Sequence, residues 1–229
     1  MIYPIRLFVG LSAVCFALAA QAQTLSLSET RLAAEQGNVK AQYELGSAYA
    51  SGRGVKRNPA EAAKWYTLAA EQGLPQAQNN LGLMYEKGRG VARNEAEAVK
   101  WYTLSAEQGD AKAQNNLGFM YAHGKGIAKD EALAVEWFRK AAEQALPQAE
   151  NNLGYMYAHG KGVAKDEAEA VKWYTQAAER GFALAQNNLA SMYHAGLGVQ
   201  KDAEEARKWW RKAAEQGDAN AKKKLENLK

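Results

Sequence analysis

The sequence predicts an all-α protein, a solenoid of stacked helix-turn-helix repeats of 36 residues. Three residue types recur at this fixed interval, and such a period is typical of repeat architectures. The tryptophans are Trp65, Trp101, Trp137, Trp173 and Trp209; the leucines are Leu45, Leu81, Leu117, Leu153 and Leu189; the tyrosines are Tyr49, Tyr85, Tyr121, Tyr157 and Tyr193. After residue 30 the chain is rich in alanine, glutamine, glutamate, lysine and leucine, which favours helix.

The first helix of a repeat can be followed in residues 74–109. Ala77, Leu81, Met84 and Tyr85 recur at helical spacing, so they form one apolar stripe. The segment 88–90, Gly-Arg-Gly, then ends the helix in a tight turn, where glycine tolerates a positive φ.

The second helix begins near Asn94, which together with Glu97 predicts an N-cap and a capping box. Asp166 with Glu169, and Asp202 with Glu205, repeat this pattern. Gly82 in the first helix and Ala98 in the second are small enough for the helices to approach closely. We expect Trp101 to fill the space between repeats.

Five full repeats follow one another, at 38–73, 74–109, 110–145, 146–181 and 182–217. A lone second helix is expected at 25–37 and a lone, lysine-rich first helix at 218–229, where it would cap the stack. Residues 23–229 therefore form a single domain. One helix pair buries too little to be stable by itself, so stacking of neighbours must supply the core. Ala145 replaces the glycine that closes the other repeats, such as Gly109.

The first 22 residues differ from the rest of the chain. Arg6 precedes an apolar run over 7–20, and Ala20-Gln21-Ala22 follows it, which predicts a secretory signal peptide cleaved after Ala22. The apolar run is shorter than the roughly 20 residues that a membrane span needs. We expect a periplasmic or secreted protein with no stable membrane span after cleavage. Cys15, the only cysteine, lies in this segment, so the mature chain would contain no disulfide.

The charge balance argues against nucleic acid as a partner. The formal net charge is +4, and the sequence contains 29 basic and 25 acidic side chains. Removal of Arg6 with the signal peptide brings the two closer still. A surplus this small is weak support for binding to nucleic acid or to an anionic surface.

The repeated pattern Ala-Gln-Asn-Asn-Leu-Gly-x-Met-Tyr-x-x-Gly-x-Gly-Val, followed by Ala-x-x-Trp-Tyr and Ala-x-x-Gly, resembles the Sel-1-like repeat, a relative of the tetratricopeptide repeat. The resemblance covers nearly all of the chain after residue 30. It implies a right-handed superhelix of α-hairpins and a role as an adaptor or scaffold in protein assemblies. For exported bacterial members it implies a partner in the cell envelope or in a host.

The resemblance also implies that the first helices line a concave groove. At about 100° per residue, two asparagine ladders should follow this surface. One comprises Asn79, Asn115, Asn151 and Asn187, and the other Asn80, Asn116, Asn152 and Asn188. Asparagine offers a donor and an acceptor, so the ladders could bind the backbone of an extended peptide. Alternatively, they are solvated or cap turns between repeats.

The position of Leu83 varies along the groove. It is occupied by Ser47, Leu83, Phe119, Tyr155 and Ser191, an apolar centre with polar ends. This distribution indicates a binding patch with aromatic anchors, although packing between helices could also explain it. His123 and His159 occupy equivalent positions beside this patch and are candidates for the groove. One helix spacing separates them too far for a shared metal, so we expect no metal site.

Arginines and lysines form a row at the turn edge, namely Arg53, Arg89, Lys125 and Lys161, beside Arg57, Arg93, Lys129, Lys165 and Lys201. The row could attract an anionic partner, or it could be a solvated edge balanced by the nearby glutamates.

Sequence motifs of common enzymes are missing, including Ser-x-x-Lys, Gly-x-Ser-x-Gly and His-Glu-x-x-His. We therefore expect no catalytic residues and no cofactor. The alternative is a penicillin-binding or weak β-lactamase-type enzyme, as implied by a cysteine-rich exported branch of the family. The predicted function is that of an exported scaffold that binds a protein or peptide.

Overall fold

The computed structural model describes residues 26–227, which form twelve α-helices and no strand. The first helices of the five repeats, called A helices, are α3 (Val39–Ser51), α5 (Pro75–Lys87), α7 (Ala111–His123), α9 (Pro147–His159) and α11 (Ala183–Ala195). The second, or B, helices are α4 (Pro59–Glu71), α6 (Glu95–Glu107), α8 (Glu131–Glu143), α10 (Glu167–Glu179) and α12 (Ala203–Glu215). Helix α2 (Leu27–Glu35) precedes them and α13 (Ala219–Glu226) follows. The predicted all-α solenoid is confirmed.

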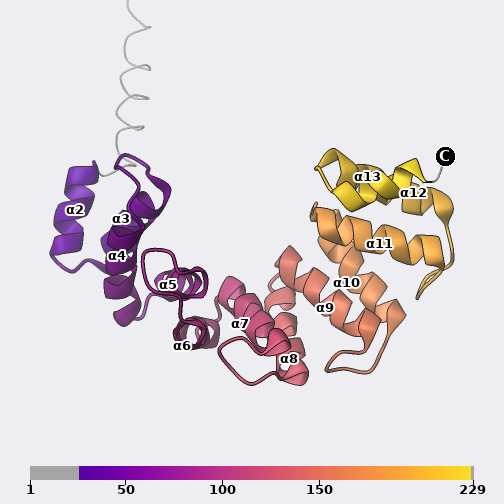
Figure 1. Ribbon diagram of the computed structural model, residues 1–229, viewed down its shortest axis with the longest axis horizontal. Coiled ribbons are helices and arrows are strands. Elements are labelled where there is room, and N and C mark those ends of the chain that lie inside the picture. Colours follow the sequence, from indigo (N-terminus) through magenta and orange to yellow (C-terminus); the bar gives the residue numbers. More distant parts are fainter. Residues whose placement is uncertain (1–25, 228–229) are drawn as a thin grey trace, which may run out of the picture.

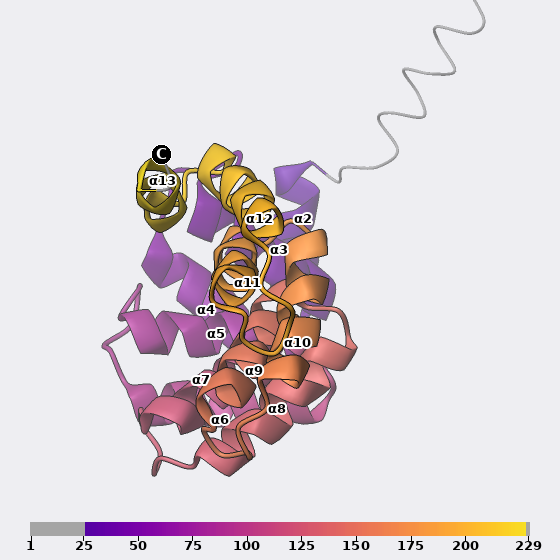
Figure 2. The same cartoon turned by 90° about the vertical axis from the view of Figure 1, so that its right-hand side faces the viewer.

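The helices form an arch whose two ends lie on the same side of the molecule (Figure 1). Near the centre of the arch the A helices α5 and α7 lie on the inner side, and the B helices α6 and α8 lie on the outer side (Figure 1). A view along the long axis shows helices from the two ends of the arch, such as α3 and α12, one behind the other (Figure 2). The concave face is therefore built mainly from A helices.

Each B helix begins at an asparagine or aspartate whose side chain accepts a hydrogen bond from the first turn, as predicted. A capping box also has a hydrogen bond from the backbone N–H of the N-cap to the glutamate side chain. The prediction of this second bond was wrong in repeats 2, 4 and 5. Glu97 of α6 does not return to the backbone of Asn94 but pairs with Lys100, one helical turn later. A lysine at this spacing offers the carboxylate an ion pair instead of a backbone N–H.

In repeats 2 to 5 the second glycine of the turn packs against the preceding repeat. Gly162 has a φ of +65°, and a Cβ at this position would lie 2.1 Å from the backbone oxygen of Glu131 in α8. Only glycine permits such an approach. This contact fixes the neighbouring Lys161 at the junction between repeats 3 and 4.

The core of each of the first four repeats depends on an aromatic ring packed over the glycine of the A helix. A Cβ on Gly82 would lie 2.8 Å from the ring of Tyr102, which is fully buried. Trp101, which the sequence suggested for the space between repeats, is half-buried and packs against the core formed by α4 and α5. The ring in closest contact with the A helix therefore belongs to the residue after the tryptophan.

Within residues 26–227, none of the helices combines the length and the apolar character needed to cross a membrane. The predicted signal peptide, its cleavage site and Cys15 lie outside the described residues.

Candidate functional site

The two asparagine ladders bond to one another. Asn116 donates its Nδ2 to Oδ1 of Asn79 over 2.9 Å, and the same bond joins Asn152 to Asn115 and Asn188 to Asn151. At the end of the series the indole N–H of Trp210 donates to Oδ1 of Asn187 over 3.1 Å. The three bonds between asparagines link A helices of successive repeats.

The prediction that the first ladder is exposed in the groove was wrong for Asn79, Asn151 and Asn187, which are buried. Each of α5, α7 and α9 is bonded to the A helix of the next repeat and also packs against the B helix of its own repeat. The face expected to point into open space is therefore partly covered. Asn152 and Asn188 are half-buried and keep one edge at the concave surface, where the second N–H and the carbonyl of the amide are available for a ligand.

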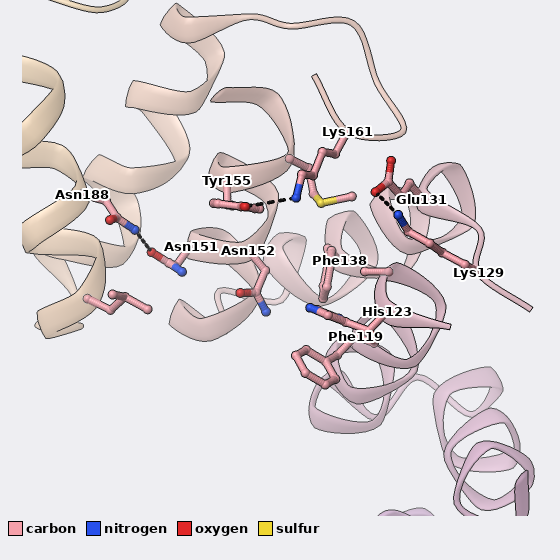
Figure 3. Close-up of a pocket in the computed structure, with 13 residues that line it drawn as sticks. Phe119, His123, Lys129, Glu131, Phe138, Asn151, Asn152, Tyr155, Lys161 and Asn188 are labelled. Atoms are coloured by element: carbon pink, nitrogen blue, oxygen red, sulfur yellow. Dashed lines mark hydrogen bonds and ion pairs between the residues drawn. The ribbon is translucent and has the colours of Figure 1, made fainter. Parts of the chain in front are cut away.

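The structure brings part of the predicted patch together in a hollow of about 630 Å³ between repeats 3 and 4, called the central hollow (Figure 3). Phe119 of α7 and Tyr155 of α9 stand on its rim, and Phe138 of α8 is part of its lining. Phe119 is half-buried, and Tyr155 is 40% exposed. An aromatic pair around a concave space is typical of a binding surface.

Two histidines hold these rims in place. The ring of His123 lies 4.0 Å from that of Phe119, and the ring of His159 lies 4.1 Å from that of Tyr155, measured between centroids. In each pair Nδ1 of the histidine is 2.9 Å from the backbone oxygen four residues earlier, that of the aromatic partner. The predicted histidines therefore orient the rim, and His123 also lines the hollow.

Lysines cover the outer side of both aromatic rings. Nζ of Lys125 and of Lys161 lie 4.9 Å from the ring centroids of Phe119 and Tyr155, respectively. Lys161 also donates a hydrogen bond of 3.1 Å to the phenol oxygen of Tyr155 (Figure 3). This bond raises the pKa of Lys161, so the ammonium group remains charged.

The charges lining the central hollow leave a positive surplus. Lys129 pairs with Glu131 over 2.8 Å, so these two charges compensate each other. Lys161 lies close enough to lower the pKa of Glu131, after the larger effect of Lys129. Within the described residues Lys161 itself has no carboxylate within ion-pair distance. The hollow thus combines apolar rings, amides and one uncompensated cation.

An equivalent hollow of about 170 Å³, called the first hollow, lies between repeats 1 and 2. Leu83 takes the place of Tyr155 there, Tyr66 that of Phe138, and Arg89 that of Lys161. Asn80 also lines it. Leu83 therefore lines the first hollow, whereas Phe119 and Tyr155 line the central one.

Between repeats 2 and 3 the equivalent position contains Glu86, a buried carboxylate. Its Oε2 accepts a hydrogen bond of 2.8 Å from the hydroxyl of Tyr102, and Lys87 pairs with its Oε1. Burial acts to raise the pKa of Glu86, but the bonds from Lys87 and Tyr102 and the charges of Lys87 and Lys125 outweigh it and lower the pKa. Burial and the neighbouring carboxylate raise the pKa of Tyr102, which keeps its proton as the donor.

Sequence reasoning missed Phe138 and Glu86, and it treated Lys161 only as part of the basic row. The departure of Glu86 from the alanines Ala50, Ala122 and Ala158 at the same repeat position was the available signal. Among residues 26–227, no group of three or more histidine, aspartate or glutamate side chains could hold a metal ion.

The fold and the repeated contacts define an α-solenoid repeat protein. The family model of the Sel1 repeat matches residues 39–74, 75–110, 111–146, 147–182 and 183–218, a frame that starts one residue later than the one expected from the sequence. The chain belongs to the Sel1 repeat family. Proteins of this family are generally scaffolds for protein interactions.

Two solved structures share more than a third of their aligned residues with the chain. One is a protective antigen present in uropathogenic Escherichia coli strains, with an SLR fold; it is 45% identical, with a TM-score of 0.81 over 87% of this chain. The chain spans only 43% of the length of that antigen. The other is a Sel1 repeat protein from Oxalobacter formigenes, 43% identical, with a TM-score of 0.79 over 83% of this chain and 76% of that one.

An immunity protein from Pseudomonas aeruginosa is 24% identical, with a TM-score of 0.55 over 80% of this chain and 66% of its own, and shows the fold alone. The search of the curated proteins gave no match.

Proposed function

We propose that this protein is an exported scaffold that binds a protein or peptide partner on its concave face, with the central hollow as the principal contact. The observation that supports this most directly is the pair of Phe119 and Tyr155, which stand beside a hollow of about 630 Å³. Each ring is already oriented by a histidine and a lysine of its own repeat. Rigid, half-exposed aromatics lose little conformational entropy on binding.

The expected partner lies in the periplasm, on the cell surface or in a host. This part of the proposal depends on the signal-peptide pattern of residues 1–22. N-terminal sequencing of the protein recovered from a periplasmic extract should begin at Gln23. An intact N-terminus in a cytoplasmic fraction would contradict export.

The binding face is tested by crosslinking in cells, with the captured proteins compared between two double variants. Phe119→Ala/Tyr155→Ala should lose the partner while keeping its helicity by circular dichroism. Leu68→Ala/Leu104→Ala is the matched control, because it removes two exposed apolar side chains from the B helices α4 and α6. Capture that survives in the first variant, or that is lost equally in both, would contradict the proposal.

The enzyme alternative has a simple test. Turnover of a chromogenic β-lactam by the purified protein, above a heat-denatured control, would replace the scaffold proposal by a catalytic one.

A further inference from the structure

The junction between repeats 2 and 3 shows what a hollow of this protein can hold. Ala50 and Ala122 leave the first and central hollows open at one repeat position, and Glu86 fills that position in between. The chain therefore places its own carboxylate at the junction between the two open hollows.

One feature of the surroundings of Glu86 recurs at the two open hollows, although Ser51 and His123 stand there in place of its ion-pair partner Lys87. Lys125 stands at the repeat position of Lys161 and Arg89, and its charge helps to lower the pKa of Glu86. In the described part of the chain neither Lys161 nor Arg89 forms an ion pair of its own. Both open hollows thus present a cation at the repeat position of Lys125, and an alanine in place of Glu86.

The apolar parts of the hollows lie next to these cations. Lys161 touches the phenol of Tyr155, and Arg89 lines the first hollow together with Leu83 and Met84. A ligand carboxylate that replaces the phenol as partner of Lys161 would exchange a neutral acceptor for a charged one, so the hydrogen bond of the ammonium group would become an ion pair. A neighbouring apolar side chain of the ligand would then reach the ring of Tyr155 or the side chain of Leu83.

We propose that the first and central hollows each bind an acidic side chain of one extended peptide segment, together with an adjacent aromatic or large aliphatic side chain. The two carboxylates pair with Arg89 and Lys161, the counterparts of the Lys125 whose charge acts on Glu86 at the junction between them. This inference rests on the proposed function, and it specifies the partner as an acidic, not a basic or neutral, segment.

The spacing of the two hollows predicts the spacing of the two acidic elements. The hollows are two repeats apart, and neighbouring A helices are separated by about 10 Å, so the distance is roughly 20 Å. An extended chain advances about 3.3 Å per residue, which places the two elements about six residues apart.

The first test measures fluorescence anisotropy of three labelled peptides with the mature protein. The test peptide carries two Asp-Phe pairs about six residues apart in a Gly/Ser chain, in line with the rise of an extended strand. In the second peptide Asn replaces Asp, and in the third Ala replaces Phe. We expect the Asn peptide to bind at least about tenfold more weakly, because the ion pair at each hollow is replaced by a hydrogen bond to a neutral amide. Equal binding of the Asp and Asn peptides, or no binding of the Asp-Phe peptide, would overturn the inference.

The second test uses variants that close or open the hollows. Ala50→Glu/Ala122→Glu should fold, because both alanines are only half-buried, and should abolish binding of the Asp-Phe peptide. Ala158→Glu is the matched control, because Leu197 replaces the cation at that junction, and it should bind as the wild type does. Lys161→Met/Arg89→Met should remove the preference for Asp over Asn. Retention of that preference in this variant would contradict the inference.

A selection from a random peptide library separates this inference from the proposed function. Binders that depend on Phe119 and Tyr155 but show no enrichment of acidic residues would leave the proposed function standing and refute the acidic partner. If no binder depends on these two residues, both fall.

Discussion

The first and central hollows occupy the same place in the repeat, yet the central one is larger, about 630 Å³ against about 170 Å³. Phe138 takes the place of Tyr66 and lacks its hydroxyl. The central hollow also extends to the next repeat, where Leu184 and Asn188 of α11 line it. The repeat frame thus creates a hollow at each site, while single substitutions set its size.

The charges of the two hollows differ as well. In the central hollow Glu131 compensates Lys129, whereas Pro59 takes its place in the first hollow and leaves Arg57 without this partner. Arg57 donates instead to the backbone oxygen of Ala50. The smaller hollow is therefore the more positive one. The repeat determines where a hollow forms, and residues that depart from the repeat determine which ligand the hollow favours.

The largest expected effect on stability distinguishes Phe138, at the floor of the central hollow, from Tyr155 at its rim. Phe138→Ala should lower the free energy of unfolding by about 3–5 kcal/mol, because the ring is buried against Gly118. Tyr155→Ala at the exposed rim should cost less than about 1 kcal/mol. Urea denaturation followed by circular dichroism measures both. A rim variant as costly as the floor variant would show that Tyr155 is part of the core rather than a contact for ligands.

The second prediction concerns the helices that carry the rims, α5 and α9. In α5 the side chain of Gln78 accepts a bond of 2.7 Å from Gln108 and donates to the backbone oxygen of Ala70. In α9 the equivalent residue is Glu150, which is fully buried and pairs with Arg180 over 3.0 Å. A carboxylate cannot donate to the preceding helix, so Oε2 of Glu150 has no hydrogen-bond partner.

Arg180→Gln should therefore cost about 2 kcal/mol at neutral pH, because it leaves a buried carboxylate without a counter-charge. Glu150→Gln should cost less, since Arg180 is half-exposed and can turn to solvent. The double variant restores the pair found in four other repeats and should match or exceed the wild type. Equal losses in the two single variants, measured by urea denaturation, would contradict this explanation.

The third prediction concerns Glu86 near the end of α5. The equivalent residue of α9 is Ala158. The pKa of Glu86 is lowered from 4.5, so its contribution to stability is present above that pH and is lost as the pH falls through the lower, folded value. The difference between wild type and Glu86→Gln should be about 1 kcal/mol at neutral pH and should vanish in acid. A difference that does not change with pH would show that the charge of Glu86 is irrelevant to stability.

The smallest effect is expected just before α9. Ala145 has a φ of +59°, while Gly73 occupies the equivalent place before α5. Ala145→Gly relieves left-handed strain of about 1–2 kcal/mol but increases the entropy of the unfolded chain, so a net gain of about 0.5 kcal/mol is expected. Gly73→Ala should instead lower the stability by a similar amount. Thermal unfolding of both variants measures these changes. A loss of stability in Ala145→Gly would show that the backbone of Ala145 is not strained.

Much of the candidate site could be predicted one repeat at a time. The position of Phe119 and Tyr155 on A helices, and the histidine four residues after each, follow from periodicity alone. The pairing of Asn152 with Asn115 could not be predicted in this way, because it depends on how far one repeat is rotated against the next. No residue pattern reports that angle.

The sequence by itself determined the repeat length, the order of A and B helices, their N-caps and the glycine turns, because all of these follow from contacts within one repeat. Only the tertiary structure decided which asparagines are buried, that Phe138 lines the central hollow, and that Glu86 fills the junction between two open ones. These features arise where three helices from two repeats meet. Their contacts depend on the packing of neighbouring repeats, which the spacing of residues along the chain does not specify.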